Sequence, residues 1–536
     1  MTLGMMVCTG LLLLGLWSPA GAGSPTGKLT SGISNDVGCL DPMVCTGGGF
    51  WPALYIGTFQ GLIGVNSETY GYEPLLSESW KISDDGMMWE FKLKKEVRFS
   101  NGEPFNAQAV KFSTDRMLGR GEYDPKLKPK FKPRYRGIWK KLYEKVEVVD
   151  DHTVRFHMKQ KTAEMFVRMD SAMPMVPPQY IRKIGDEEFG RKPISTGPWK
   201  ITGRKIGESI TLGANTDYWN RNPKKGQHST PYIKTIVQRL IPEDETRISA
   251  LRVGEVDLVV NIPPHRSDAL KKDANINLKY QKENAPIYIG INVVKDKDPK
   301  TGKPNPWRDI RLRKAISYAI NREELVKHIL TGQEPLHYIL TPGQLGFDPE
   351  IAKKYIPPYD PEKAKKLVKE AGFPKGLDAV LNAASGRLPM TKEVTEAIAG
   401  YLTSVGIRTK VSIAEYRVIT GKIRSKELYP LDFWLAATGP EPLFMLRGAV
   451  ASNNSWGLHR GDPVLDGYIK EAFAEFDPQK RAVIYRKIFA YFAEEAVFFV
   501  PLYCSVNITG LRGDRWTWEP TTYARWPEYH LIKHKK

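Results

Sequence analysis

Carboxylates, arginines and histidines supply the reactive groups of this 536-residue chain, yet their spacing matches no catalytic motif. The sequence has no H-E-x-x-H, G-x-S-x-G, Walker-type glycine loop or C-x-x-C, the patterns of zinc, serine, nucleotide and thiol chemistry. The adjacent acids Glu243 and Asp244 stand at an expected helix start, where the helix dipole explains them. Nine histidines, including His265 and His459, are scattered without metal-ligand spacing. These observations predict a protein that is not an enzyme and that carries no cofactor or metal.

Positive charge dominates the composition, with a formal net charge of +19. Solubility is the ordinary effect of such an excess, and attraction of an anionic ligand or an anionic membrane surface is a sharper one. Residues 126–145, KLKPKFKPRYRGIWKKLYEK, alternate bases with aromatics and prolines. Base and aromatic interleaving is typical of proteins that bind single-stranded nucleic acid. The prolines and an export signal favour a solvated loop instead, so we expect no nucleic-acid partner.

The N-terminus carries that export signal. An apolar run from Leu11 to Trp17 is too short to span a bilayer, and Ala20-Gly21-Ala22 follows it as a cleavage site. We expect residues 1–22 to be a cleavable signal peptide and the protein to be periplasmic. An oxidising compartment makes a disulfide between Cys39 and Cys45 plausible. Cys504 lies in an apolar run and is expected to be a buried free thiol.

Residues 76–118 have the clearest local pattern in the chain. Asp85-Gly86 is a turn signal, because glycine accepts the positive φ of a tight hairpin. Alternating apolar residues predict one buried face of a strand pair, closed by a second turn at Asn101-Gly102. Asn106 is the expected N-cap of a helix that continues to about Leu118. The apolar residues of this face are Trp89, Phe91, Leu93, Val97 and Phe99.

Strands and helices alternate through the rest of the chain and predict a mixed α/β protein. Residues 237–241 form an expected strand, and the helix 247–253 that follows is stopped by Gly254. Residues 286–292, PIYIGIN, are a further strand, and VFFVPLY near the C-terminus is another. Four further helix starts carry capping residues, namely Asp309, Asn321, Asp360 and Asp477.

The order of these residues is more specific than their periodicity. SWKISDDGMMWEFKLK, followed by VRFSNGEPFNAQAVKF, resembles the bacterial extracellular solute-binding proteins of family 5. These are the periplasmic receptors of peptide, nickel, opine and some glycan ABC importers. Further segments resemble the family in the same order, including DVGCLDP near the N-terminus and STGPWK with DYWN later in the chain. The resemblance covers nearly all of residues 30–510.

This resemblance implies an α/β fold of the type II periplasmic-binding-protein class. Two large lobes and a small extra domain would close on a ligand by a hinge motion. Domain I would be discontinuous, with domain II inserted early and domain III late in the chain. The expected boundaries are 1–22 for the signal peptide, 23–65, 192–285 and 500–536 for domain I, 66–191 for domain II and 286–499 for domain III.

The resemblance also assigns candidate ligand-binding residues. In peptide-binding relatives an acidic residue at the position matched by Asp36 lies beside the ligand, although a solvated strand-end carboxylate is an equal alternative. The loop LAATGPEPLF matches a family loop whose acid pairs with the ligand amine, and Thr438 falls at that acidic position, next to Gly439. Thr438 cannot neutralise a buried ammonium, which needs a carboxylate. Either Asp36 or Glu441 takes over, the ligand lacks a free amine, or the match is displaced by a residue or two.

Three further side chains complete the predicted site. Arg387 could bind a ligand carboxylate bidentately, with a surface arginine as the alternative. Trp434 and Phe50 could form apolar walls, as concave sites usually have, although packing in the core would also explain each of them.

The expected function is that of a receptor for an ABC importer. A peptide or peptide-like solute would be captured between two lobes and delivered to permease subunits with associated ATPases, and the receptor would act as a monomer. A non-peptide solute such as an oligosaccharide, opine or metal chelate is the alternative ligand. A periplasmic chaperone-like binder of unfolded chains is the alternative from a different class.

Overall fold

The computed structural model describes most of the chain after the N-terminal segment. The described residues are 24–34, 36, 39–44, 57–128, 130–171, 173–221, 223–331, 340–385, 388–425, 427–435, 439–452, 462–524 and 526–536. No helix in this part of the chain combines the length and the apolar character that crossing a membrane requires. Strands and helices are both abundant, as the sequence predicts.

A ten-stranded mixed sheet runs through the larger part of the molecule, in the order β14-β13-β15-β12-β16-β11-β1-β10-β9-β8. We call β1 and β8 to β11 the first half-sheet and β13 to β15 the second half-sheet; β12 and β16 are the crossing strands between them. The first half-sheet contains β1 (Thr26–Ile33), β8 (Trp199–Lys205), β9 (Ser209–Ala214), β10 (Ile233–Leu240) and β11 (Leu258–Val259). The others are β12 (Ile276–Ile291), β13 (Leu377–Ser385), β14 (Ile407–Glu415), β15 (Leu431–Leu435) and β16 (Phe499–Arg512).

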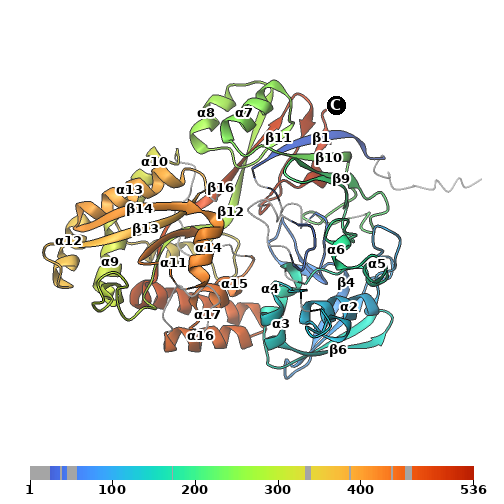
Figure 1. Cartoon of the computed structure of the whole chain (residues 1–536), viewed down its shortest axis with the longest axis horizontal. Helices are drawn as coiled ribbons and strands as arrows, with labels where there is room; N and C mark the ends of the chain where they lie inside the picture. Colours follow the sequence, from blue (N-terminus) through green and yellow to red (C-terminus); the bar gives the residue numbers. More distant parts are fainter. Residues whose placement is uncertain are drawn as a thin grey trace, which may run out of the picture.

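The crossing strands join the two half-sheets and lie in the middle of the molecule (Figure 1). They pair antiparallel from Ile276, opposite Arg512, to Gly290, opposite Phe499. The register breaks between Lys282 and Pro286 and again next to Tyr288. Strand breaks of this kind bend a ladder and remove hydrogen bonds that would stiffen it. Every residue of β16 is buried, which explains its nearly continuous apolar sequence.

A separate four-stranded antiparallel sheet has the order β4-β5-β7-β6. Its strands are β4 (Ser77–Ile82), β5 (Met88–Leu93), β6 (Tyr143–Asp150) and β7 (Thr153–Met158). The turn at Gly86, with φ of 72°, joins β4 to β5 as predicted. The prediction of a second strand after β5 is wrong. Beyond β5, an isolated bridge between Arg98 and Pro104 spans the Asn101-Gly102 turn. Strand β5 pairs with β4 and β7 instead. The apolar face is nevertheless buried, because its residues pack under the helix α2 (Ala107–Leu118).

Helix caps follow the sequence closely. The side chains of Asn106, Asp309, Asn321, Asp360 and Asp477 each accept a backbone hydrogen bond in the first turn of their helix. The last four of these residues cap α9 (Ile310–Ala319), α10 (Arg322–His328), α12 (Pro361–Glu370) and α17 (Pro478–Tyr491). The helix α7 (Asp244–Val253) starts three residues earlier than expected and ends at Gly254. These caps satisfy amide groups that a helix leaves unpaired.

The remaining helices cover the sheets and connect them (Figure 1). They are α3 (Arg136–Leu142), α4 (Glu164–Ser171), α5 (Pro178–Ile184), α6 (Asp186–Phe189), α8 (Pro264–Lys271), α11 (Pro349–Lys354), α13 (Thr391–Ser404), α14 (Tyr416–Arg424), α15 (Leu443–Met445) and α16 (Pro463–Ala474). Short strands pair as β2 (Ile63–Val65) with β3 (Tyr72–Pro74) and β17 (Trp516–Thr517) with β18 (Lys533–His534). Separate apolar cores surround the four-stranded sheet, the second half-sheet and the first half-sheet. The domain boundaries themselves stay a prediction.

Candidate functional site

Helix α4, next to the four-stranded sheet, contacts the helices beside the second half-sheet. Glu164 of α4 accepts hydrogen bonds from both Nε and Nη2 of Arg447, at 3.2 and 2.6 Å. Arg447 belongs to the turn η3 (Leu446–Val450), which directly follows α15. Glu164 is 1% exposed, and the backbone amide of Ala163 beside it donates to the carbonyl of Phe473. The pair therefore fixes how two parts of the molecule that are distant in sequence meet.

Phe476 forms the second contact between these parts. It lies between α16 and α17, and its ring meets that of Trp89 on β5 edge to face, with centroids 5.7 Å apart. The ring also covers the β4–β5 turn, where a Cβ at Gly86 would come within 2.5 Å of it. Glycine is thus required at this turn both for its positive φ and for the approach of Phe476. The Phe476 ring thus packs against the core of the four-stranded sheet.

Glu441 is held tightly by α17. Its two carboxylate oxygens accept hydrogen bonds from Nε and Nη2 of Arg481, both at 2.6 Å, and from the hydroxyl of Tyr485 at 2.7 Å. Burial opposes the charge of Arg481, but the carboxylate raises its pKa, and burial beside Glu441 raises the pKa of Tyr485 well above its usual value. If Glu441 neutralised a ligand amine, its ion pair with Arg481 would be broken. The buried arginine would then have no carboxylate partner, which is energetically unfavourable.

Asp36 faces the β8–β9 hairpin. Its carboxylate accepts from Nη2 of Arg204 at 3.3 Å and from the backbone amide of Gly207 at 3.1 Å. The side chain is 29% exposed. Asp36 therefore has its hydrogen-bond partners at the edge of the first half-sheet. Glu441 has its partners on α17, in a different part of the molecule.

Trp434 and Gly439 lie at the end of β15. Trp434 is 6% exposed, and its ring stacks on that of Tyr416 with centroids 5.8 Å apart and planes at 7°. The carbonyl of Gly439 accepts from the side-chain amide of Gln344 at 2.9 Å. A Cβ at Gly439 would lie 4.0 Å from the hydroxyl of Tyr72 on β3. Gly439 thus lies near the β2–β3 ribbon.

Several predicted residues lie outside the described part of the chain, namely Phe50, Arg387, Thr438 and Cys45. Cys39 is disulfide-bonded, and its pairing with Cys45 stays a prediction. Cys504 is buried and forms no disulfide, as expected.

Sequence reasoning missed a buried acid beside the crossing strands. Asp432 of β15 is 2% exposed and lies opposite Gly290 of β12, where its carboxylate fills the space of a side chain. Among the described residues its Oδ2 has no hydrogen-bond partner. Burial raises the pKa of Asp432 to about 7. A lone acid in the apolar strand LDFWL was the available signal.

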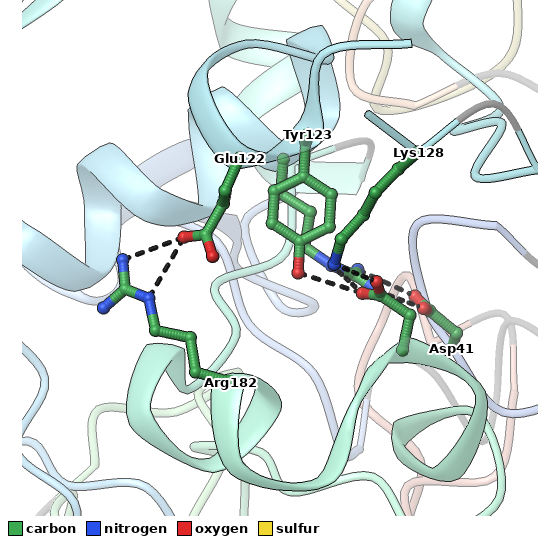
Figure 2. Close-up of polar contacts among 7 residues, drawn as sticks. Asp41, Glu122, Tyr123, Lys128 and Arg182 are labelled. Carbon is green, nitrogen blue, oxygen red and sulfur yellow. Dashed lines mark hydrogen bonds and ion pairs between the residues drawn. The ribbon is translucent and has the colours of Figure 1, made fainter. Parts of the chain in front are cut away.

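A second missed feature is a buried ion cluster beside the four-stranded sheet (Figure 2). Arg116 of α2 is fully buried and donates to both Asp41 and Asp186. Asp186 also accepts from the hydroxyl of Tyr123 at 2.9 Å and from Nζ of Lys128 at 2.6 Å. Burial alone would raise the pKa of Asp186, but Lys128 and Arg116 hold it below its usual value. The cluster ties the loop around Asp41 to α2 and α6.

With this geometry in view, comparisons with known proteins decide the family. The model "Bacterial extracellular solute-binding proteins, family 5 Middle" matches residues 71–456. The chain belongs to this family. A curated relative is the glutathione-binding protein GsiB of Escherichia coli (strain K12), 28% identical over 441 residues that make up 80% of each chain. Members of the family are extracellular solute-binding transport proteins, and our chain is one of them.

Solved structures share the fold over almost the whole chain. One is the periplasmic binding protein DppA from Helicobacter pylori in complex with the peptide STSA. It has a TM-score of 0.79 and 23% identity, with 95% of this chain and 98% of that chain covered. Another is MoaA from A. tumefaciens R10 in complex with mannopinic acid, with a TM-score of 0.75, 23% identity and coverage of 95% and 100%. The fold is therefore the expected α/β fold of type II periplasmic binding proteins.

Proposed function

We propose that this protein is the periplasmic receptor of an ABC importer and captures a peptide or peptide-like solute between two lobes. The first half-sheet would belong to one lobe and the second half-sheet to the other. The observation that carries the proposal is the pair of crossing strands, whose register breaks lie between the half-sheets. A ligand that touches both lobes favours the closed form by its differential affinity, and a permease reads that form.

The ligand class is supported by the relatives. GsiB is named for glutathione, and DppA holds the peptide STSA, so small peptides with free carboxylates are the first candidates. MoaA holds mannopinic acid, an opine, which supports a non-peptide solute as the second candidate. Because Glu441 and Asp36 already pair with Arg481 and Arg204, we propose that neither of them holds a ligand amine. Thr438, Gly439, Arg387, Phe50 and Trp434 remain the proposed lining.

Delivery would follow export. Residues 1–22 would be removed, and the mature monomer would meet permease subunits with their ATPases. The lobes would be domain I (23–65, 192–285 and 500–536) and domain III (286–499), with domain II (66–191) as the extra domain. N-terminal sequencing of the protein from a periplasmic extract is expected to begin at Gly23, and a sequence that begins at Met1 would contradict export by cleavage.

The ligand is identified by native mass spectrometry of protein purified gently from a periplasmic extract, followed by denaturation and analysis of what is released. A released peptide, or calorimetric binding of glutathione or of a tetrapeptide, would support the first candidate. A released opine or sugar would replace it with the second. Binding of denatured protein that no small solute displaces would instead overturn the receptor and favour the chaperone-like class.

A further inference from the structure

Residues 126–135 form a basic segment between α2 and α3, and its inner side contacts the buried ion cluster. Lys128 turns inward and donates to Asp186 at 2.6 Å (Figure 2). The guanidinium of Arg116 lies 4.3 Å from the centre of the Phe131 ring. The backbone amide of Arg134 donates to the carbonyl of Met43 at 2.9 Å. These contacts anchor the backbone of the segment to the buried ion cluster and to the loop around Asp41.

The outer side of the same segment carries positive charge that no described carboxylate pairs with, although Arg134 lies over the Tyr135 ring at 5.0 Å. Lys126, Lys130, Lys132 and Arg134 are exposed, and none of them forms an ion pair with another residue that the structure describes. Leu127, next to Lys126 in the sequence, is 70% exposed. We call these five residues the basic face.

Neighbouring carboxylates do not neutralise the basic face. Glu122 accepts two hydrogen bonds from Arg182, at 2.9 and 3.1 Å (Figure 2). Asp124 accepts from the backbone amide of Lys126 at 2.8 Å. Four like charges within nine residues, without matching acids, repel one another unless an anion shares them.

The aromatic residues of the segment point inward, and this bears on the partner. Phe131 and Tyr135 are half-buried and pack against the core of the four-stranded sheet. Tyr123, before the segment, is 2% exposed, and Trp139, in α3, is fully buried. Single-stranded nucleic acid is bound by exposed rings on which bases stack. Because these rings pack against the core, the alternation of bases and aromatics has a structural cause: the rings face inward, and the bases other than Lys128 lie outside.

We propose that the basic face docks on a membrane surface of anionic phospholipids, with Leu127 entering the headgroup region. Bases flanking an exposed apolar residue combine the two attractions that hold peripheral proteins at an interface. Each base near an anionic surface strengthens binding about fivefold. Figure 1 places α3 and β6, which follow the segment, at the end of the molecule away from β1, β10 and β11. Docking there would leave the crossing strands free to move.

The test is flotation of the purified mature protein with vesicles of phosphatidylglycerol in phosphatidylcholine, and with vesicles of phosphatidylcholine alone. We expect binding to the anionic vesicles only, weakening as salt is raised above about 0.15 M. The fourfold variant K126E/K130E/K132E/R134E is expected to bind at least about a hundredfold more weakly. The variant Leu127→Ser should weaken binding severalfold and leave its salt dependence unchanged.

A matched control separates the basic face from the net charge. K234E/K392E/K470E/K487E changes four exposed lysines on β10, α13, α16 and α17, so the net charge falls by the same amount. This control should bind like the wild type. An equal loss of vesicle binding in both fourfold variants would overturn the proposal. Equally strong binding to vesicles of pure phosphatidylcholine would also overturn it. So would binding of the wild type to an acidic protein but not to anionic vesicles. Circular dichroism of all variants shows that each remains folded.

Discussion

The pair formed by Glu441 and Arg481 shows what one buried charge contributes to this protein. The two side chains are 5% and 3% exposed, and Tyr485 completes the arrangement. Replacing Arg481 by Met would leave a carboxylate in a desolvated place, which costs about 3–5 kcal/mol. We expect the free energy of unfolding, measured in urea, to fall by that amount.

A surface pair provides the control for this measurement. Arg191 and Glu187 are 67% and 84% exposed. Arg191→Met should change the free energy of unfolding by less than about 0.5 kcal/mol. Similar losses in the two variants would show that burial does not decide the strength of the Glu441 pair.

Asp432 predicts an unusual dependence of stability on pH. Its pKa is about 7 in the folded protein, against about 3.9 in an unfolded chain. The folded state therefore binds the proton more tightly, and its contribution, at most about 4 kcal/mol, is present below about pH 4 and lost as the pH rises through 7. Asp432→Asn should gain stability relative to the wild type between these pH values in urea titrations, whereas Asp378→Asn, on an exposed side chain, should not. Parallel curves for wild type and Asp432→Asn would refute the assignment.

Residue-level prediction from sequence succeeded where the interaction is local. A cap such as Asp360 binds the amide of Lys363, so both partners stand within one helical turn. Glu441 and Arg481 are 40 residues apart, and Asp36 and Arg204 are 168 apart. The local sequence around Glu441 or Asp36 does not indicate which arginine pairs with it. Both acids could therefore be interpreted as ligand contacts. The family resemblance supplied the fold because it encodes such distant pairings as residue order.

At the scale of elements, the C-terminal segment docks on the first half-sheet through tryptophans and a histidine pair. Trp516, Trp518 and Trp526 belong to the core of this half-sheet. The rings of His228 and His530 lie 4.9 Å apart. Burial lowers the pKa of His228 to about 4. A proton on either ring would thus oppose docking of the segment.

Acid should therefore loosen the C-terminal segment. The folded pKa of His228 lies below its unfolded value of about 6.5, so its contribution, about 2–3 kcal/mol, is present above that pH and lost as the pH falls toward 4. We expect tryptophan fluorescence to report exposure of the segment over this range. His228→Gln should shift the transition to lower pH, and His265→Gln, at an exposed residue, should not. An unchanged transition in His228→Gln would contradict the role of the pair.

Element boundaries illustrate the limit of pattern reading. The turn at Gly86 was predictable because its two residues specify it. Its contact with Phe476 was not predictable, because the two residues are almost 400 positions apart in the sequence. The apolar residues Val97 and Phe99 were correctly expected to be buried, and the strand they suggested did not form, because β7 takes the place beside β5. Periodicity fixes which face is buried, while tertiary pairing decides which strands meet.

At the scale of the whole molecule, the proposed closure would depend on contacts between α4 and η3 as well as on the crossing strands. Glu164 is buried by its contact with Arg447, on elements that no regular hydrogen-bonded ladder joins. When the two parts separate, water would reach both charges. The ion pair would therefore contribute to the balance between closed and open forms, and removal of one partner would penalise the closed form alone.

Arg447→Ala is expected to open the unliganded protein. In the closed form Glu164 would lose its guanidinium, at a cost of about 2–4 kcal/mol, whereas in the open form water would solvate the carboxylate. The open population should rise by about a hundredfold relative to the closed one, and small-angle X-ray scattering should show a larger radius of gyration. Arg408→Ala breaks an exposed pair with Asp378 inside the second half-sheet and should leave the scattering unchanged. A ligand that binds both lobes should restore the compact form of Arg447→Ala at a higher concentration than the wild type needs. Scattering curves that coincide for Arg447→Ala and wild type without ligand would show that the crossing strands alone set the balance.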